Sequence, residues 1–424
     1  MLDRNLLRTH PDRAREGARL KKVDAPIDAF LKVDESWRAL LAELQGDQAE
    51  MNQLSKSIGA LMAQGKGEEA EQAKAQTGAL KEKVRAGEQR QRALEEEMAA
   101  LELRIPNIPD PGVPHGDGEE QNVVVRTWGE PAQPDVPKPH WEIAEDLGLL
   151  DLARGAKISG SGFIVYTGWG ARLQRALIQY MIDHQTLRNG YREIFPPYLV
   201  NDQSLLGTGQ LPKFEEDLYK AGDGLYLVPT AEVPVTNLYR DEILDGDDLT
   251  IKLAAYSACF RKEAGAAGKD TRGLLRVHQF DKVELVKFTK PEESKSELEA
   301  LVQDAEQILQ ALGLHYRVAE MCTAELGFSN AKQYDLELWA PGVGKFLEIS
   351  SCSDFEAFQA RRANIRFRRA QGEKPEFVHT LNGSGLACPR LFAAILETFL
   401  QPDGSVLVPE PLRPYVGTDR ITRS

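Results

Sequence analysis

Residues 255–288, AYSACFRKEAGAAGKDTRGLLRVHQFDKVELVKF, contain two strand-like segments separated by a charged, glycine-containing loop. The first, residues 256–260, is a short apolar run that ends at Arg261, and the second is residues 274–288. Apolar runs rich in β-branched and aromatic residues on either side of a polar, Gly-containing segment are typical of a β-hairpin. We therefore expect a hairpin with a long, charged loop.

The second strand of this hairpin is expected to carry three chemically different side chains on one face. Side chains alternate between the two faces of a strand, so Phe280, Lys282 and Glu284 share one surface, next to Arg261. Arginine suits phosphate or carboxylate, an aromatic face suits a purine, and a carboxylate suits an ammonium group. The set fits a nucleotide beside an amino acid. The alternative is that Phe280 is core, Glu284 pairs with Lys282, and the loop is a solvated turn.

The length of the chain predicts two to three domains. The chain has 424 residues, of which 42% are hydrophobic and 28% charged, and its net charge is −13. No segment is apolar enough for a membrane span or a secretory h-region, so we expect a cytoplasmic protein. The four cysteines show no CxxC pairing, so we expect free thiols. The acidic surface argues against non-specific polyanion binding, and any nucleic acid should meet a local patch.

Residues 27–103 are typical of long helices. Apolar residues recur at steps of three and four, with interruptions at Asp47 and Gln91, and the glycines of residues 65–67 end the first helix. The second helix should fold back, which gives an antiparallel coiled-coil arm. Residues 56–92 contain eight Lys or Arg against five Glu. A modest basic surface could meet phosphates, and the alternative is a solvated coiled-coil face with ordinary ion pairs.

The middle of the chain alternates between proline-rich and regular segments. Residues 105–140 are dense in proline, which excludes helix and marks a domain boundary. Residues 169–189 have a helical pattern and lead into residues 191–200, a strand whose prolines favour an edge or interface position. Residues 291–312 predict a packing helix.

Four further segments carry polar groups in settings that suggest chemistry. Residues 208–214 form a Gly/Pro loop with a cation, and residues 227–234 place Thr230 and Glu232 between prolines, which predicts a rigid and exposed presentation. Residues 345–349 predict an apolar strand that ends in the carboxylate and hydroxyls of residues 348–351, which suit Mg²⁺. In residues 381–390, glycines precede a helix whose first turn carries Arg390, where a phosphate could sit. Each segment alone also fits a turn or cap.

Together these segments resemble the three signature motifs of the class II aminoacyl-tRNA synthetases. Motif one resembles the helix and strand around Pro196, motif two residues 260–280, and motif three residues 385–390. The arm and residues 208–214, 230–232, 263–268 and 348–351 narrow the resemblance to the seryl-tRNA synthetases of the bacterial type. No class I signature is present.

The resemblance implies an α+β fold, with a six- to seven-stranded antiparallel sheet flanked by helices after an N-terminal two-helix coiled coil, in a homodimer. It implies a tRNA-binding coiled-coil domain (1–104), a Pro-rich linker (105–140) and a class II catalytic domain (141–424). The implied reaction joins L-serine to ATP as seryl-adenylate. The seryl group then passes to serine tRNA, and to selenocysteine tRNA where that exists.

The resemblance also assigns roles to residues at matching positions. Arg261, Glu284 and Arg390 would be catalytic, with Arg261 on the α-phosphate and the serine carboxylate, and Arg390 on the γ-phosphate. The serine site would consist of Thr230, Ala231, Glu232, Glu284 and Ser384. The ATP site would consist of Arg261, Lys262, Glu263, Val277, Phe280, Glu348, Ile349, Ser350, Ser351 and Arg390. Glu348 and Ser351 would bind Mg²⁺.

Two other functions remain open at this point. A related synthetase could load an activated amino acid onto a carrier protein, but such relatives are expected to lack the arm. A non-catalytic scaffold or tRNA chaperone would have no need of Arg261, Glu284 and Arg390.

Overall fold

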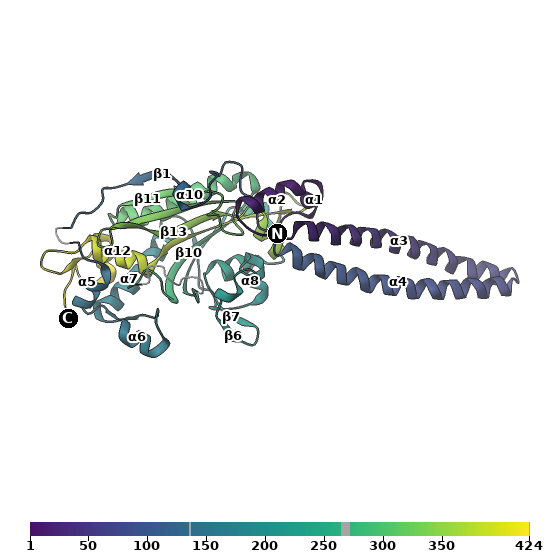
Figure 1. Ribbon diagram of the computed structural model, residues 1–424, viewed down its shortest axis with the longest axis horizontal. Coiled ribbons are helices and arrows are strands. Elements are labelled where there is room, and N and C mark those ends of the chain that lie inside the picture. The colour runs from purple at the N-terminus through teal and green to yellow at the C-terminus, as the bar shows by residue number, and fades with distance from the viewer. Residues whose placement is uncertain (135–136, 264–271, 424) are drawn as a thin grey trace. The chain divides into compact units, whose positions relative to one another are not determined.

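The computed structural model describes residues 1–134, 137–263 and 272–423 (Figure 1). The chain divides into two compact units. One comprises Leu2–Glu16 and Asp24–Ile105, and the other comprises Met1, Gly17–Val23 and Pro106–Ser424.

The smaller unit contains the predicted pair of long helices, α3 (Ile27–Ala63) and α4 (Gly67–Glu102). They run side by side in Figure 1 and turn at Gly65, whose positive φ of 74° only glycine adopts easily. The seam buries Leu44, Val84 and Met98. Asp47, where the apolar pattern is interrupted, accepts a hydrogen bond from Lys83 Nζ at 3.0 Å across the seam. The predicted antiparallel coiled coil is confirmed.

Two short helices that the sequence patterns did not predict, α1 (Arg4–Thr9) and α2 (Pro11–Leu20), precede the arm. α1 is attached to α3 by Asp34, a carboxylate whose side chain is 1% exposed. It accepts hydrogen bonds from Arg8 Nη2 at 2.6 Å and from Arg38 Nε at 2.9 Å. Burial alone would raise the pKa of Asp34, but the two guanidinium groups hold it below its ordinary value.

The larger unit is built on an eight-stranded sheet with the order β1-β11-β12-β13-β16-β10-β9-β4. All neighbours are antiparallel except β4 and β9, which are parallel. The expected six to seven strands are therefore too few, because the Pro-rich segment contributes β1, which pairs with β11 at one edge. The strands are β1 (Val123–Trp128), β4 (Arg192–Ile194), β9 (Ile251–Phe260), β10 (Gln279–Thr289), β11 (Tyr316–Glu320), β12 (Lys332–Ala340), β13 (Lys345–Asp354) and β16 (His379–Ala387).

Three helices, α7 (Gly168–Leu187), α10 (Ser294–Ala311) and α12 (Cys388–Thr398), share the main hydrophobic core with the sheet. Val283 and Leu285 of β10 point into this core, whereas Val286 and Phe288 pack in a second core with residues of α9 (Glu232–Thr236) and α11 (Phe358–Ala363). The sheet therefore has a helix-covered layer on each face over part of its area.

β4 is the last strand at its edge, as the prolines at 196 and 197 predicted. None of the helices in the described residues is both long and apolar enough to cross a membrane. The remaining elements are α5 (His140–Asp146), β2 (Leu150–Asp151), α6 (Leu152–Ser159), β3 (Val165–Tyr166), β5 (Leu199–Asn201), α8 (Asp202–Thr208), β6 (Lys220–Gly222), β7 (Leu225–Leu227), β8 (Ile243–Asp245), β14 (Arg366–Arg368), β15 (Glu376–Phe377), β17 (Val406–Leu407), α13 (Arg413–Val416) and β18 (Arg420–Ile421).

The buried ion pairs of Asp34 predict a pH-dependent contribution to stability. Asp34→Asn should lower the free energy of unfolding of the arm by about 2 kcal/mol at pH 7, because two charge-assisted hydrogen bonds lose their anion. A carboxyl with a lowered pKa stabilises the fold above its unfolded pKa and loses this effect as the pH falls through its folded pKa. Hydrogen exchange of α1 and α3 should therefore differ between variant and parent at pH 7, and the difference should shrink below about pH 4. An equal difference at both pH values would contradict the assignment.

Candidate active site

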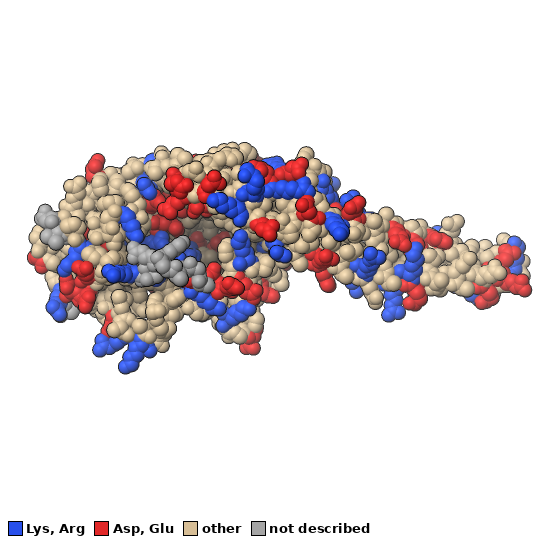
Figure 2. Space-filling model, viewed as in Figure 1, with Lys and Arg blue, Asp and Glu red and all other residues tan. Residues whose placement is uncertain are grey.

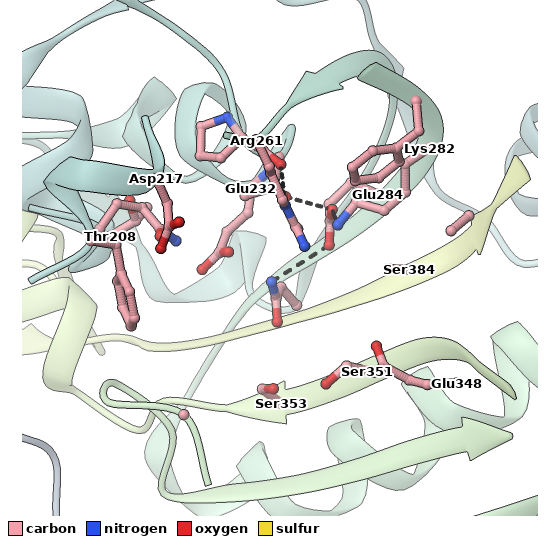
Figure 3. A pocket seen from close by; sticks show the side chains of 18 of the residues that line it. Thr208, Asp217, Glu232, Arg261, Lys282, Glu284, Glu348, Ser351, Ser353 and Ser384 are labelled. Atoms are coloured by element: carbon pink, nitrogen blue, oxygen red, sulfur yellow. Dashed lines mark hydrogen bonds and ion pairs between the residues drawn. The ribbon is translucent and has the colours of Figure 1, made fainter. Parts of the chain in front are cut away.

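A cavity of about 650 Å³ opens on one face of the large sheet, over β10, β13 and β16. Figure 2 shows acidic and basic side chains gathered around this hollow. Figure 3 shows the side chains that enter it from β10 and β13 and from the segment before α9. All of its lining residues belong to the larger unit.

β10 supplies the floor of the cavity through its alternation. Phe280, Lys282 and Glu284 all line the cavity, whereas Val283 and Leu285 lie in the main core on the other face. The predicted shared face is thus confirmed. The strand begins at Gln279 rather than at residue 274, because residues 272–276 form bends and turns next to Gly273, whose φ is +62°.

A buried carboxylate, Glu284, organises one end of the cavity. It is 1% exposed, accepts a hydrogen bond from Thr230 Oγ1 at 2.7 Å, and pairs with Lys282 Nζ at 2.5 Å. Asn382 Nδ2 lies 3.5 Å from its other oxygen. Ser384, which pairs with Glu284 in the ladder between β10 and β16, also lines the cavity. This end can accept a small polar molecule with an ammonium group.

Glu232 is the second carboxylate at this end, and its pKa is raised to about 7. Burial is the main cause, and repulsion from Glu284 adds to it, while a hydrogen bond from Gln359 Nε2 at 2.6 Å opposes it. Thr230 and Glu232 are only 4% and 6% exposed, so the predicted exposed presentation is wrong. The reason is that α9 begins at Glu232 and packs its apolar residues into the second core, which turns the polar groups inward.

Arg261 lies at the end of β9, above the floor of the cavity. Its Nε donates to the carbonyl oxygen of Pro229 at 3.2 Å, and its guanidinium carbon lies 5.2 Å from the centre of the Phe280 ring. This cation–π contact holds the arginine where a phosphate or carboxylate bound in the cavity could reach it.

The other end of the cavity is formed by β13, which extends to Asp354 rather than ending at Ile349 as expected. Glu348 and Ser351 are three residues apart, so a regular strand would place them on opposite faces. The pairing with β12 shifts by one residue between Leu336 and Glu337, which leaves Ile349 as the extra residue of a bulge. Both Glu348 and Ser351 consequently face the cavity (Figure 3).

These two side chains fit a hard divalent cation that also binds substrate phosphates. Glu348 is 53% exposed, and beneath Ser351 the buried carboxyl of Asp335 has a pKa raised to about 8, mainly by burial and then by Glu348. Mg²⁺ is commonly held by one or two protein oxygens together with phosphates and water. No cluster of three or more His, Cys, Asp or Glu residues suited to a metal occurs among the described residues, so substrate oxygens would have to complete the shell.

Arg390 and Glu263 occupy the same end. Arg390, in the first turn of α12, donates to the carbonyl oxygens of Glu348 and Leu275. Glu263 pairs with Arg276 Nη1 at 2.6 Å. Val277 and Ile349 complete this wall.

Three residues assigned to the site from sequence do not line the cavity. The Ala231 side chain packs in the second core, and Ser350 points to the sheet interior, where its hydroxyl donates to the carbonyl oxygen of Ser384. Lys262 lies with its ammonium 5.8 Å from the centre of the Tyr219 ring. Of the 263–268 motif, residues 264–268 lie outside the described residues.

Conversely, the cavity contains residues to which the sequence reasoning gave no role. Asn382 lies in the glycine-rich segment that was singled out but was given no role, and Lys282 was placed on the shared face of the strand without a ligand of its own. Arg276 is another such residue. The alternation of the strand correctly placed Lys282 on the cavity-facing side, and only its role was left unassigned.

Comparison with known proteins places this geometry in a family. Residues 1–109 match the model of the seryl-tRNA synthetase N-terminal domain, and residues 213–399 match that of the class II tRNA synthetase core domain (G, H, P, S and T). A serine–tRNA ligase of Caldicellulosiruptor saccharolyticus is 56% identical over 424 residues, which is 99% of this chain and 100% of that one.

Solved structures agree over the full length. The seryl-tRNA synthetase of Pyrococcus horikoshii complexed with ATP has a TM-score of 0.94 at 37% identity and covers 100% of both chains. The cytoplasmic serine–tRNA ligase of Naegleria fowleri in complex with AMP has a TM-score of 0.89 at 31% identity, covering 100% of this chain and 99% of that one. With a matching arm, a matching core and relatives of this identity over its whole length, the chain belongs to the class II seryl-tRNA synthetase family.

Proposed function

We propose that this cavity condenses L-serine with ATP to seryl-adenylate and then transfers the seryl group to serine tRNA. Serine–tRNA ligase activity follows from the family, and the roles of individual residues are our proposal. The observation that carries these roles is that Glu284, Arg261 and Glu348 face one cavity, with a polar pocket at one end and cation-binding groups at the other.

At the serine end, Glu284 would receive the ammonium group and Arg261 the carboxylate. Thr230, Glu232 and Ser384 offer hydrogen-bonding groups for the hydroxyl. An amino acid without a hydroxyl would leave these buried groups unpaired, which is a strong basis for rejection. Ala231 would contribute only through its backbone, because its side chain lies in the core.

At the nucleotide end, adenine would stack near Phe280 between Val277 and Glu263, with Arg261 on the α-phosphate and Arg390 on the γ-phosphate. Glu348 and Ser351 would hold Mg²⁺, which would neutralise phosphate charge. Attack of a carboxylate on phosphorus requires alignment and charge neutralisation rather than a protein nucleophile. The two arginines on either side of the phosphate chain meet that requirement.

The arm is the proposed tRNA-binding element. Basic and acidic side chains are interspersed along it (Figure 2), and Lys66, Lys74 and Lys83 form ion pairs. This mixed surface suits recognition of the shape and backbone of folded RNA rather than strong non-specific binding. Selenocysteine tRNA would be charged in the same way where present. The presence of the arm also disfavours loading of a carrier protein.

We also propose a homodimer in the cytoplasm. Leu187 at the end of α7 and Phe195 after β4 are 80% and 73% exposed, and a second copy could cover these apolar side chains. The four cysteines are buried free thiols, which suits a reducing compartment.

ATP–pyrophosphate exchange with each of the twenty amino acids tests the activation step. Serine alone should support exchange, and Arg261→Ala should reduce kcat/KM by at least about 10²-fold, because it removes charge neutralisation at the reacting phosphate. Arg369→Ala is the control, since this exposed arginine pairs with Glu292 and Glu376. Exchange with another amino acid, or near-normal exchange by Arg261→Ala, would contradict the proposal.

Serine binding should depend on pH through Glu232. Its pKa of about 7 means that the Glu232 carboxyl group is partly protonated at neutral pH in the enzyme without serine. The ammonium group of bound serine would favour the ionised carboxylate of Glu232. The KM for serine should therefore fall as the pH rises from about 6 to 8. Glu232→Gln should flatten this dependence, and an unchanged pH profile in that variant would show that another group is responsible. Lys282, Arg261 and Glu284 are the charged groups that face it.

Deletion of residues 31–101 should separate the two half-reactions. Exchange should stay within about threefold of the full chain, because the cavity lies wholly in the larger unit, while the kcat/KM for charging serine tRNA should fall by more than about 10²-fold. Equal loss of both activities would mean that the arm is needed to fold the catalytic unit.

A further inference from the structure

A fully buried histidine and glutamate, His140 and Glu397, connect the start of α5 to α12 outside the cavity. Both side chains are 0% exposed. Glu397 Oε1 accepts from the backbone N–H of His140 at 2.9 Å and lies 2.7 Å from His140 Nδ1. Its Oε2 accepts from the backbone N–H of Gly342 at 2.9 Å. The carboxylate is therefore satisfied by three contacts from two residues, His140 and Gly342.

The other ring nitrogen of His140 contacts the chain that leads into the cavity. The backbone N–H of Leu274 points at His140 Nε2 at 3.0 Å. An N–H can only donate, so Nε2 must be the acceptor and the ring proton must reside on Nδ1, where it is donated to Glu397. Gly273 packs against the same ring, since a Cβ there would lie 2.4 Å from Nε2. The carboxylate thus fixes the tautomer, and the tautomer holds Leu274.

The segment held in this way supports the nucleotide end of the cavity. Residues 274–277 all line it. The carbonyl oxygen of Leu275 accepts from Arg390 at 3.4 Å, and Arg276 pairs with Glu263 at 2.6 Å. Val277 is the next residue of the wall. The three residues after the anchor at Leu274 therefore contact or provide groups proposed to meet ATP, because Leu275 contacts Arg390, Arg276 contacts Glu263, and Val277 lines the wall.

We propose that His140 and Glu397 are positioning residues for ATP, which hold residues 274–277 in register through one defined histidine tautomer. This inference rests on the proposed function. It assigns no direct contact with substrate to either side chain. The proposal predicts an effect on the binding of ATP and none on the binding of serine. The serine end is held by β10 and by the segment before α9, which His140 does not touch.

Two substitutions of His140 separate its two hydrogen bonds. In His140→Asn the side-chain amide can still donate to Glu397 but does not reach Leu274, whereas in His140→Gln the amide oxygen can accept from Leu274. We expect His140→Asn to raise the KM for ATP in serine-dependent exchange about tenfold, equivalent to about 1.4 kcal/mol. His140→Gln should raise it less than about threefold, and the KM for serine should stay within about twofold in both.

The tautomer itself gives a measurement that needs no variant enzyme to be active. In the full chain with ¹⁵N-labelled histidine, the His140 signal, assigned by its loss in His140→Gln, should have the pattern of a neutral ring protonated on Nδ1. A ring protonated on Nε2, or on both nitrogens, would overturn the inference. So would equal KM values for ATP in the two variants, or a parallel rise in the KM for serine. If the parent chain shows no exchange with serine, the proposed function fails instead, and the tautomer measurement still stands.

Discussion

Burial of the Glu284 carboxylate is the constraint on which the cavity depends. A lone buried carboxylate is costly, and Glu284 is tolerated because Thr230 and Lys282 converge on it. Those partners come from the segment before α9 and from the same strand two residues earlier. The sheet must therefore present alternate residues of β10 to the cavity and to the core at once, and the second core must hold the segment carrying Thr230 in place.

Structural features that depend on the sequence of one local segment were predictable. The arm, the hairpin and the edge position of β4 each follow from a local period or from proline. The exposure of Thr230 and Glu232 was mispredicted, because burial there depends on the contacts of α9 with distant strands. The positions of Glu348 and Ser350 depend on a bulge in the pairing with β12, which leaves no mark in the sequence of β13. β1 was missed because its hydrogen bonds come from β11.

The predictions of site residues were likewise correct for some residues and wrong for others. Arg261, Glu284 and Arg390 were named from motifs whose members are far apart in the chain, and the sheet brings all three to one cavity. Ala231, Lys262 and Ser350 were named because they adjoin such residues, and they turn away from it. Only Ser350 of these three lies in a strand, where alternation turns it away, whereas Ala231 precedes α9 and Lys262 follows β9. Motif membership alone therefore overestimates the number of side chains that meet a ligand.

The bulge at Ile349 makes the length of β13 as important as its composition. Every residue on one side of the bulge is out of phase with those on the other, so removing one residue there would restore the regular alternation. Glu348 and Ser351 would then be two residues apart and would still share the cavity face. A point substitution in this strand alters one wall position, whereas an insertion or deletion of a single residue elsewhere in β13 would move all the residues on one side of it to the opposite face. The geometry of this wall therefore depends on where the extra residue of β13 lies as well as on which side chains the strand carries.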